Sequence, residues 1–310
     1  GCLLQAGLAP WAGGNWSTLD APSVYAVTQA ELANDVALVR FDNSANVFGN
    51  NGALLTRRGS FIGDVSGDGI ADWTVFLSNT NGFCVMRGLA SQPAITTIST
   101  LSGPDHTCLL GGAAFFNHVN VNQAGHHVAS VGDINGDGIG DFGMSARLTA
   151  GSGGVIGEGY VVVYLGKSNA LPDLANPNLR FRGISIGLGG TFGNDYSGFC
   201  GTGDFDGAAG ATDDLVITEP FINKVHVIPG RTSWTASTSL QVHFFAGQAV
   251  PPEVYANDVL DMWTVQSATN PWGSPGSPPI FGFRCAPAGD VLPTPTGMGT
   301  GVRDDLLIHQ

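Results

Sequence analysis

Lysine, and charged side chains in general, are scarce in this chain of 310 residues. The lysines are Lys167 and Lys224 alone, and 12 lysines and arginines stand against 25 aspartates and glutamates, a net charge of −13. Such a chain has no basic groove to neutralise phosphates, so nucleic acid is not expected as a partner. Apolar runs of the roughly 18 residues that span a membrane are missing as well. No long amphipathic helical pattern occurs, which leaves strands and turns as the expected regular structure.

Glycine and proline are plentiful instead, with 46 and 17 residues respectively. This composition suits many short strands joined by tight turns. The length alone would allow one large domain or two. Regular internal repeats favour a single all-β domain over residues 1–310.

The stretch from Gly132 to Asp141 has the spacing of a calcium-binding loop. Its oxygens fall at positions 1, 3, 5, 7 and 9, on Asp133, Asn135, Asp137, the main-chain carbonyl of Ile139, and Asp141. Calcium takes six to eight oxygens, and Gly138 at position 6 permits the sharp turn that folds them inward. An EF-hand would place glutamate at position 12 between helices, but Met144 stands there and the flanking residues 127–131 and 142–145 have the pattern of strands. The loop is therefore expected to join two strands.

An earlier copy of this loop, at residues 63–73, is equally complete, so in chain order it is the first loop and residues 132–141 form the second. Its oxygens are those of Asp64, Ser66, Asp68, the carbonyl of Ile70, and Asp72. We expect a structural calcium ion at each of these two loops, because oxygen-only ligands suit calcium rather than zinc or iron.

Two further copies are less complete. The third keeps Asp204 and Asp206 and crosses a short insertion to Asp214. The fourth opens at Asp290, has Leu292 at position 3, and crosses a longer loop to the pair 304–305. These sequences leave calcium binding open at the third and fourth loops.

Other repeated features accompany the loops. Phe-Gly pairs occur at 48–49, 192–193 and 281–282, with Phe116–Asn117 in the second unit, and apolar segments ending in glycine occur at 83–88, 160–166 and 225–230. On these residues nearly the whole chain resembles the FG-GAP repeat of integrin α-chain propellers and related bacterial secreted proteins. The resemblance implies a β-propeller whose calcium ions stiffen the outer strand connections. The Gly-Ala-Pro of integrin repeats is not well matched, since residues 145–147 and 218–220 stand in its place.

The repeat spacing predicts the number of blades. The opening aspartates are 69, 71 and 86 residues apart, and the path from Asp290 through both termini to Asp64 spans 84 residues. The segment 305–310 begins the second strand of a unit, and residues 23–27 and 36–41 can supply the third and fourth. We therefore expect four blades, closed by strands from both termini. A fragment of a six- or seven-bladed ring is the alternative.

Five cysteines suggest disulfides. Cys84 and Cys108 fall in one repeat, while Cys200 and Cys285 precede the opening aspartates of neighbouring repeats. The hypothesis is a local bridge in the first case and a bridge between two blades in the second, as would fit an oxidising compartment outside the cell. Cys2 is left over, and can pair with another chain, carry a lipid or remain free.

Catalytic candidates are few. His126–His127 lies at the entrance to an expected inner strand, but adjacent strand residues point to opposite faces, so only one could face a given site. No Ser/His/Asp or Cys/His set can be assembled from spacing. The acidic pairs 213–214 and 304–305 are better interpreted as altered cation sites than as catalytic acids.

One aromatic residue points to a partner surface. Trp272 lies in the Pro/Gly/Ser-rich segment 270–279, which is expected to form a long exposed loop, and such loops commonly carry contacts. Its ring could stack on a sugar. Other tryptophans are more simply explained as packing between blades.

The repeats and their spacing predict a calcium-stabilised propeller, and the resemblance to integrin-type repeats implies a secreted binding or adhesion module for protein or glycan partners at the cell surface or in the extracellular matrix. One alternative is a structural subunit of an extracellular filament or surface layer, with other copies of the chain as partners; low lysine, abundant glycine and Cys2 would suit it. The other alternative is a polysaccharide lyase or hydrolase, which would need a cluster of His, Tyr, Arg and acidic residues at one mouth of the ring.

Overall fold

The computed structural model describes sixteen segments of the chain, and every regular element in them is a β-strand, as the composition predicted. None of these segments forms a helix of the length and apolarity needed to cross a membrane. The described residues are 40–42, 55–77, 82–90, 95–97, 102–109, 124–147, 159–182, 198–201, 203–205, 207, 212–219, 224–234, 253–255, 263–266, 284–289 and 304–309.

The strands form four successive sheets and one separate pair. The first sheet has the order β2-β3-β4-β7-β6: β2 (Leu55–Gly63), β3 (Asp72–Leu77), β4 (Gly82–Met86), β7 (His106–Leu109) and β6 (Ser102–Gly103). The second has the order β8-β9-β10-β11-β15: β8 (Ala124–Gly132), β9 (Asp141–Arg147), β10 (Gly159–Tyr164), β11 (Leu179–Arg182) and β15 (Glu253–Tyr255).

The third sheet has the order β12-β13-β14-β16: β12 (Phe199–Cys200), β13 (Leu215–Glu219), β14 (Lys224–Ile228) and β16 (Trp263–Gln266). The fourth consists of β17 (Arg284–Gly289) and β18 (Asp305–His309). Neighbouring strands are antiparallel, except that β15 joins β11 in parallel and β1 (Arg40–Asp42) pairs in parallel with β5 (Ile95–Thr97).

The same unit therefore recurs in the first three sheets: a first strand, an acidic loop, a second strand and a third. The three apolar segments expected to be third strands are confirmed as β4, β10 and β14. The acidic loops join β2 to β3 and β8 to β9, so the prediction that they connect strands is also confirmed.

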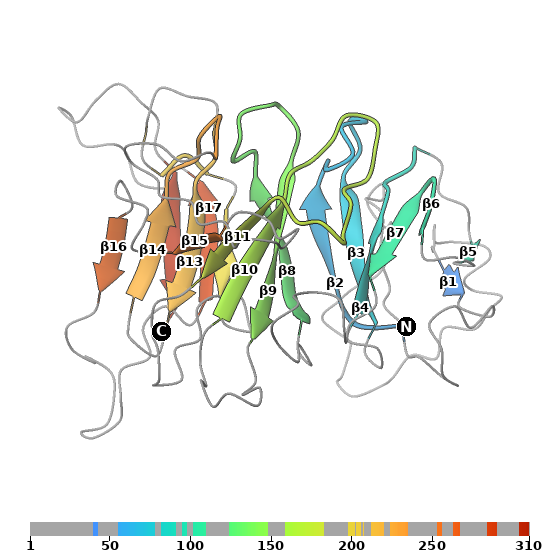
Figure 1. Ribbon diagram of the computed structural model, residues 1–310, viewed down its shortest axis with the longest axis horizontal. Helices are drawn as coiled ribbons and strands as arrows, with labels where there is room; N and C mark the ends of the chain where they lie inside the picture. Colours follow the sequence, from blue (N-terminus) through green and yellow to red (C-terminus); the bar gives the residue numbers. More distant parts are fainter. Residues whose placement is uncertain are drawn as a thin grey trace, which may run out of the picture.

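The sheets pack face to face in chain order, β2 against β8, β8 against β12, and β12 against β17. Figure 1 shows the first sheet, the second sheet and the third sheet following one another along the long axis of the molecule. Strand β10 shows why its sequence is apolar throughout. Val162 and Tyr164 pack towards the first sheet, while Val161 and Val163 pack towards the third, because both faces of the second sheet are buried.

We call the face of a sheet towards the preceding sheet its backward face and the face towards the following sheet its forward face. The outward faces of the first and fourth sheets are named in the same directions. Phe199 of the third sheet illustrates the contact between them. Its ring lies on the backward face, edge-on to His127 with ring centroids 4.6 Å apart. A Cβ added to Gly143 on the second sheet would come within 2.7 Å of the same ring. Glycine at 143 therefore makes room for a phenylalanine of the next sheet.

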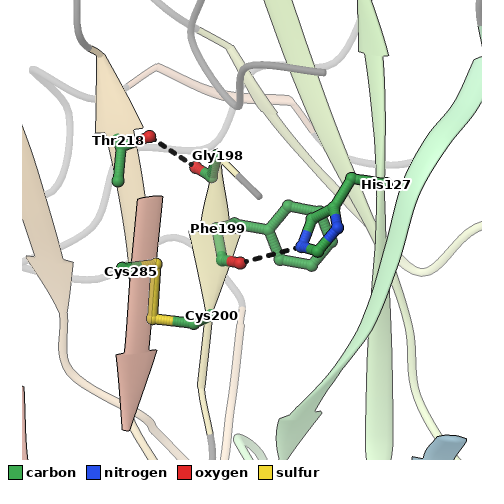
Figure 2. The surroundings of a disulfide bond; sticks show 6 residues. All are labelled: His127, Gly198, Phe199, Cys200, Thr218 and Cys285. Atoms are coloured by element: carbon green, nitrogen blue, oxygen red, sulfur yellow. Dashed lines mark hydrogen bonds between the residues drawn. A yellow bond between two sulfur atoms is a disulfide. The ribbon is translucent and has the colours of Figure 1, made fainter. Parts of the chain in front are cut away.

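Both proposed cysteine pairs form disulfides. Cys84 and Cys108 are cross-strand neighbours on β4 and β7 of the first sheet. Cys200 and Cys285 join β12 to β17, so this bridge ties the third sheet to the fourth as expected (Figure 2).

The described residues include only some of the strands that were predicted to close the ring. The segment from Asp305 does form the second strand of a unit, because β18 pairs with β17. The stretch 36–41, expected in the same blade, overlaps β1, which instead pairs with β5. Strands β17 and β2 lie on opposite sides of β8 (Figure 1). The segment 23–27 and the Phe-Gly pairs lie outside the described residues, so closure by both termini stays a prediction.

Candidate calcium loops and the contacts between them

The two complete acidic loops share one internal arrangement. In the second loop the carboxylate of Asp133 accepts hydrogen bonds from the backbone N–H groups of Gly136 (2.7 Å), Asp137 (3.1 Å) and Gly138 (2.7 Å). Asp64 does the same for Asp68 (3.0 Å) and Gly69 (2.7 Å) in the first loop. The opening aspartate therefore gathers the turn around its own side chain.

The position-6 glycines allow this turn. Gly69 and Gly138 have φ angles of 85° and 84°, in the left-handed region that side chains with a Cβ disfavour. The next N–H, that of Ile139, donates to Asp137 at 2.9 Å, and the Asn135 amide donates to the other oxygen of the same carboxylate at 3.0 Å. Positions 1, 3 and 5 are thus brought together by the local backbone, as their spacing predicted.

The closing aspartates, at position 9 of the first two loops and after the insertion in the third, have a different environment. Asp72, Asp141 and Asp214 are almost completely buried, whereas Asp68 and Asp137 at position 5 are exposed. Each closing carboxylate accepts one backbone N–H from the start of its own loop and one from the glycine that follows the third strand. The donor pairs are Ser66 and Gly88 for Asp72, Ile134 and Gly166 for Asp141, and Phe205 and Gly230 for Asp214, at 2.7–3.0 Å. The closing aspartate therefore fastens the loop to the third strand of its sheet.

This contact explains why each third strand is followed by glycine. A Cβ on Gly88, Gly166 or Gly230 would collide with the carbonyl oxygen of Ala71, Gly140 or Asp213, the residue before each closing aspartate. Only glycine lets the two backbones approach closely enough for its N–H to reach the carboxylate.

Burial and neighbouring acids make the closing carboxylates of the first two loops, Asp72 and Asp141, harder to ionise. Burial raises the pKa of Asp141 to about 7, and the nearby carboxylates of Asp137 and Asp133 add to this rise, although two backbone N–H donors oppose it. The pKa of Asp72 is also raised, again chiefly by burial, with Asp68 contributing. Three acidic side chains in one short loop thus repel one another, and a bound cation would relieve that repulsion.

The loops are also bonded to one another from sheet to sheet. The residue before each closing aspartate donates its N–H to the carbonyl of the opening aspartate in the preceding loop. These bonds run from Gly140 to Asp64 (3.0 Å), from Asp213 to Asp133 (2.9 Å) and from Asp304 to Asp204 (3.0 Å). Asp304, next to the closing aspartate of the fourth repeat, therefore makes the same bond as its counterparts in the second and third.

Asp213 and Asp304 make a second bond that Gly140 cannot make. The carboxylate of Asp213 accepts the N–H of Asp133 at 2.7 Å, and that of Asp304 accepts the N–H of Asp204 at 3.1 Å. Each pair of aspartates is therefore joined by two reciprocal hydrogen bonds, which we call the aspartate clamp. The sequence interpretation of these acids as altered cation sites missed this role, because their partners lie 80 and 100 residues away.

The donor chemistry of the first two loops fits calcium. Each loop offers carboxylate, hydroxyl or amide, and main-chain oxygens, the ligand types that this hard cation prefers. Each carboxylate oxygen can accept about two hydrogen bonds. Most carboxylate oxygens of these two loops accept one of the hydrogen bonds given above, which leaves a lone pair for a cation. Among the described residues no three His, Cys, Asp or Glu side chains are arranged to hold a metal. Calcium also uses oxygens of asparagine, serine, the main chain and water, so such a convergence is not required.

The two loops differ in one neighbour. The guanidinium of Arg87 lies 4.0 Å from the carboxylate of Asp68 in the first loop. The corresponding residue beside the second loop, one before Gly166, is the uncharged Leu165. The second loop is therefore the better candidate for a divalent cation.

The remaining sequence candidates fall in different places. The ring of His127 contacts Phe199 and lies 3.2 Å from its carbonyl oxygen through Nε2, which holds this histidine between two sheets (Figure 2). His126 lies beside it on β8, with its side chain outside the described residues, and Asp206 and Trp272 also lie outside them. No family model matches the chain, and no curated protein is similar to it in sequence.

Proposed function

We propose that this protein is a secreted, calcium-stabilised binding or adhesion module built from FG-GAP-type repeats. The observation that carries the proposal is the set of equivalent acidic loops, each fastened to its own sheet and bonded to the loop of the next. A cation bound in such a loop stiffens the junction between sheets rather than a single turn. Because the unfolded chain lacks the assembled loop, calcium would stabilise the folded state by mass action.

The disulfides support export from the cell. Bridges of this kind persist in oxidising environments such as the cell exterior. The acidic surface and scarce lysine are consistent with a soluble partner-binding protein, and the expected ligand is a protein or a glycan.

A binding role accords better with His127 than a catalytic one does. Its imidazole is part-buried between the second and third sheets, in contact with an aromatic ring and a backbone carbonyl. A general base needs access to a substrate proton. We therefore assign His127 to packing between sheets.

Calcium binding is tested by replacing Asp137 with asparagine. The amide oxygen of Asp137→Asn can still accept the N–H of Ile139, but the loop loses a negative charge. We expect the calcium-induced rise in melting temperature to fall by at least half, while the melting temperature in chelator stays the same or increases.

Asp173 provides a matched control, because it makes the same contacts away from the loops. It accepts the N–H of Ala175 at 3.0 Å and the Asn176 amide at 2.8 Å. The Asp173→Asn variant should keep the full response to calcium. Equal responses in the two variants, or no response to millimolar calcium in the wild type, would refute the metal assignment.

The binding role is tested on arrays of glycans and matrix proteins in calcium. We expect binding that is lost in Trp272→Ala without a change in melting temperature. Retained binding would move the contact surface elsewhere, and the absence of binding to either class at micromolar protein would contradict the role itself.

A further inference from the structure

Two large apolar side chains of the described residues, Phe61 and Leu307, are strongly exposed. Phe61 on β2 is 59% exposed and Leu307 on β18 is 63% exposed. They lie in the first and the fourth sheet of the series. Burying an apolar side chain of this size is favourable, so a partner surface that covered it would gain stability.

Strand alternation decides which way each side chain points. Ile62 packs towards the second sheet, so its neighbour Phe61 lies on the backward face of the first. Leu306 and Ile308 pack towards the third sheet, so Leu307 between them lies on the forward face of the fourth. Ala286, the cross-strand neighbour of Leu307, is exposed on the same face. The two side chains thus stand on the two outward faces of the series.

The repeat shows what normally covers such positions. Leu307 lies two residues after its closing aspartate, as Gly143 lies two residues after Asp141. Gly143 is covered by Phe199 of the next sheet. Phe199 is paired with Ile217 of its own sheet, which lies three residues after the closing aspartate. In the first sheet the residue with that register is Gly59, opposite Val75.

The residues at this contact complement each other in size, one large and one small. Glycine of the second sheet receives phenylalanine of the third, whereas leucine of the fourth sheet would meet glycine of the first. Phe61 would likewise meet a glycine of the other sheet. Its equivalent in β8, Ser130, lies against Gly63, the last residue of β2. A Phe61 placed in the same way against a fourth sheet would meet Gly289, the last residue of β17.

We propose that the forward face of the fourth sheet, marked by Leu307, docks onto the backward face of the first sheet, marked by Phe61, of a second copy of this chain. Among the described strands, β17 and β2 lie on opposite sides of β8 in Figure 1, so the proposal assigns the two faces to different copies of the chain. The contact is heterologous, using two different patches, and therefore propagates into an open chain of molecules unless it closes into a ring. This inference adds a partner to the proposed binding role and does not depend on calcium.

Two single variants test the geometry. Leu307→Lys blocks the forward face and Phe61→Glu blocks the backward face, and each leaves the other face intact. By sedimentation velocity in calcium, wild-type protein should form oligomers that grow with concentration. Each variant alone should associate at least tenfold more weakly, and an equimolar mixture should form a 1:1 dimer and nothing larger, because only one pair of intact faces remains.

Ala175 supplies the matched controls. It is exposed, and its neighbour Leu174 packs between the first and second sheets rather than on either outward face, so Ala175→Lys and Ala175→Glu should associate like the wild type. Wild-type protein that remains monomeric at all concentrations would overturn the proposal, as would variants that still form long oligomers.

Cysteine cross-linking separates a second copy from closure within one chain. On a Cys2→Ser background, a mixture of Phe61→Cys and Gly289→Cys should give a disulfide-linked dimer, and the chain carrying both substitutions should give a ladder of covalent oligomers. A double variant that forms only an internally bridged monomer would refute docking between copies, since the chain would then close on itself.

Discussion

The aspartate clamp gives Asp213 a structural role between two loops, and its replacement gives a direct measure of that role. Asp213 accepts the N–H of Asp133 at 2.7 Å and returns its own N–H to the carbonyl of Asp133 at 2.9 Å. The Asp213→Ala variant removes only the first bond. It leaves the N–H of Asp133 part-buried without its charged acceptor.

A hydrogen bond to a charged group contributes about 1.5–3 kcal/mol, and the half-exposed position of Asp213 favours the lower end of this range. We therefore expect Asp213→Ala to lower the free energy of unfolding by about 1.5 kcal/mol. Asp213→Asn retains an uncharged acceptor, so its loss should be about half as large. The corresponding melting temperatures should fall by about 2 and 1 °C.

The assay is urea unfolding in chelator, which removes any contribution from calcium bound near Asp133. Asp304→Ala should behave like Asp213→Ala, because it breaks the same bond between the third and fourth sheets. Two results would refute the reasoning: an Asp213→Ala variant as stable as the wild type, or an asparagine variant that loses as much as the alanine variant.

Three further predictions concern the loops and the packing between sheets. Because burial raises the pKa of Asp141 to about 7 from 3.8, the folded protein binds more protons than the unfolded chain between these values, so stability in chelator should fall as pH rises from about 4 to 7. Asp141→Asn should flatten that part of a pH series of urea titrations. Gly143→Ala should destabilise by about 1–3 kcal/mol through overpacking against Phe199, and Phe199→Leu in the same chain should recover part of the loss in a double-mutant cycle. Arg87→Leu should strengthen calcium binding at the first loop, measured by calorimetry, because it removes the cation beside Asp68; unchanged affinity would show that Arg87 does not compete.

Much of the local structure could be predicted from the sequence, because its causes lie within a few residues. The spacing of Asp133, Asn135 and Asp137 around Gly138 determines the turn, and the turn forms with bonds between residues at most five apart. The apolar runs that form β4, β10 and β14 could also be predicted as strands from the sequence. The cysteine pairs followed from their places in the repeats, because Cys84 and Cys108 fall in one unit and lie in one sheet, whereas Cys200 and Cys285 fall in neighbouring units and join two sheets.

The contacts between repeats were harder to predict. Asp213 and Asp304 are adjacent to the closing aspartates, so the sequence offers cation binding as their nearest explanation. Their actual partners are backbone N–H groups of another loop, which no residue-type pattern identifies. Likewise, the glycines after the third strands were recognised as a repeated feature, but their cause is the approach of a distant carbonyl.

The interactions that join neighbouring sheets change in kind along the chain. The first and second loops have full sets of oxygen ligands, and the residue at the clamp position of the second is Gly140, which makes a single bond to Asp64. The third and fourth loops have fewer ligands, yet they carry Asp213 and Asp304, which make two. The last junction also has the bridge between Cys200 and Cys285. Where the cation ligands decline, hydrogen bonds and a covalent bond replace them, so the junction between the first two sheets is the one whose stability should depend most on calcium.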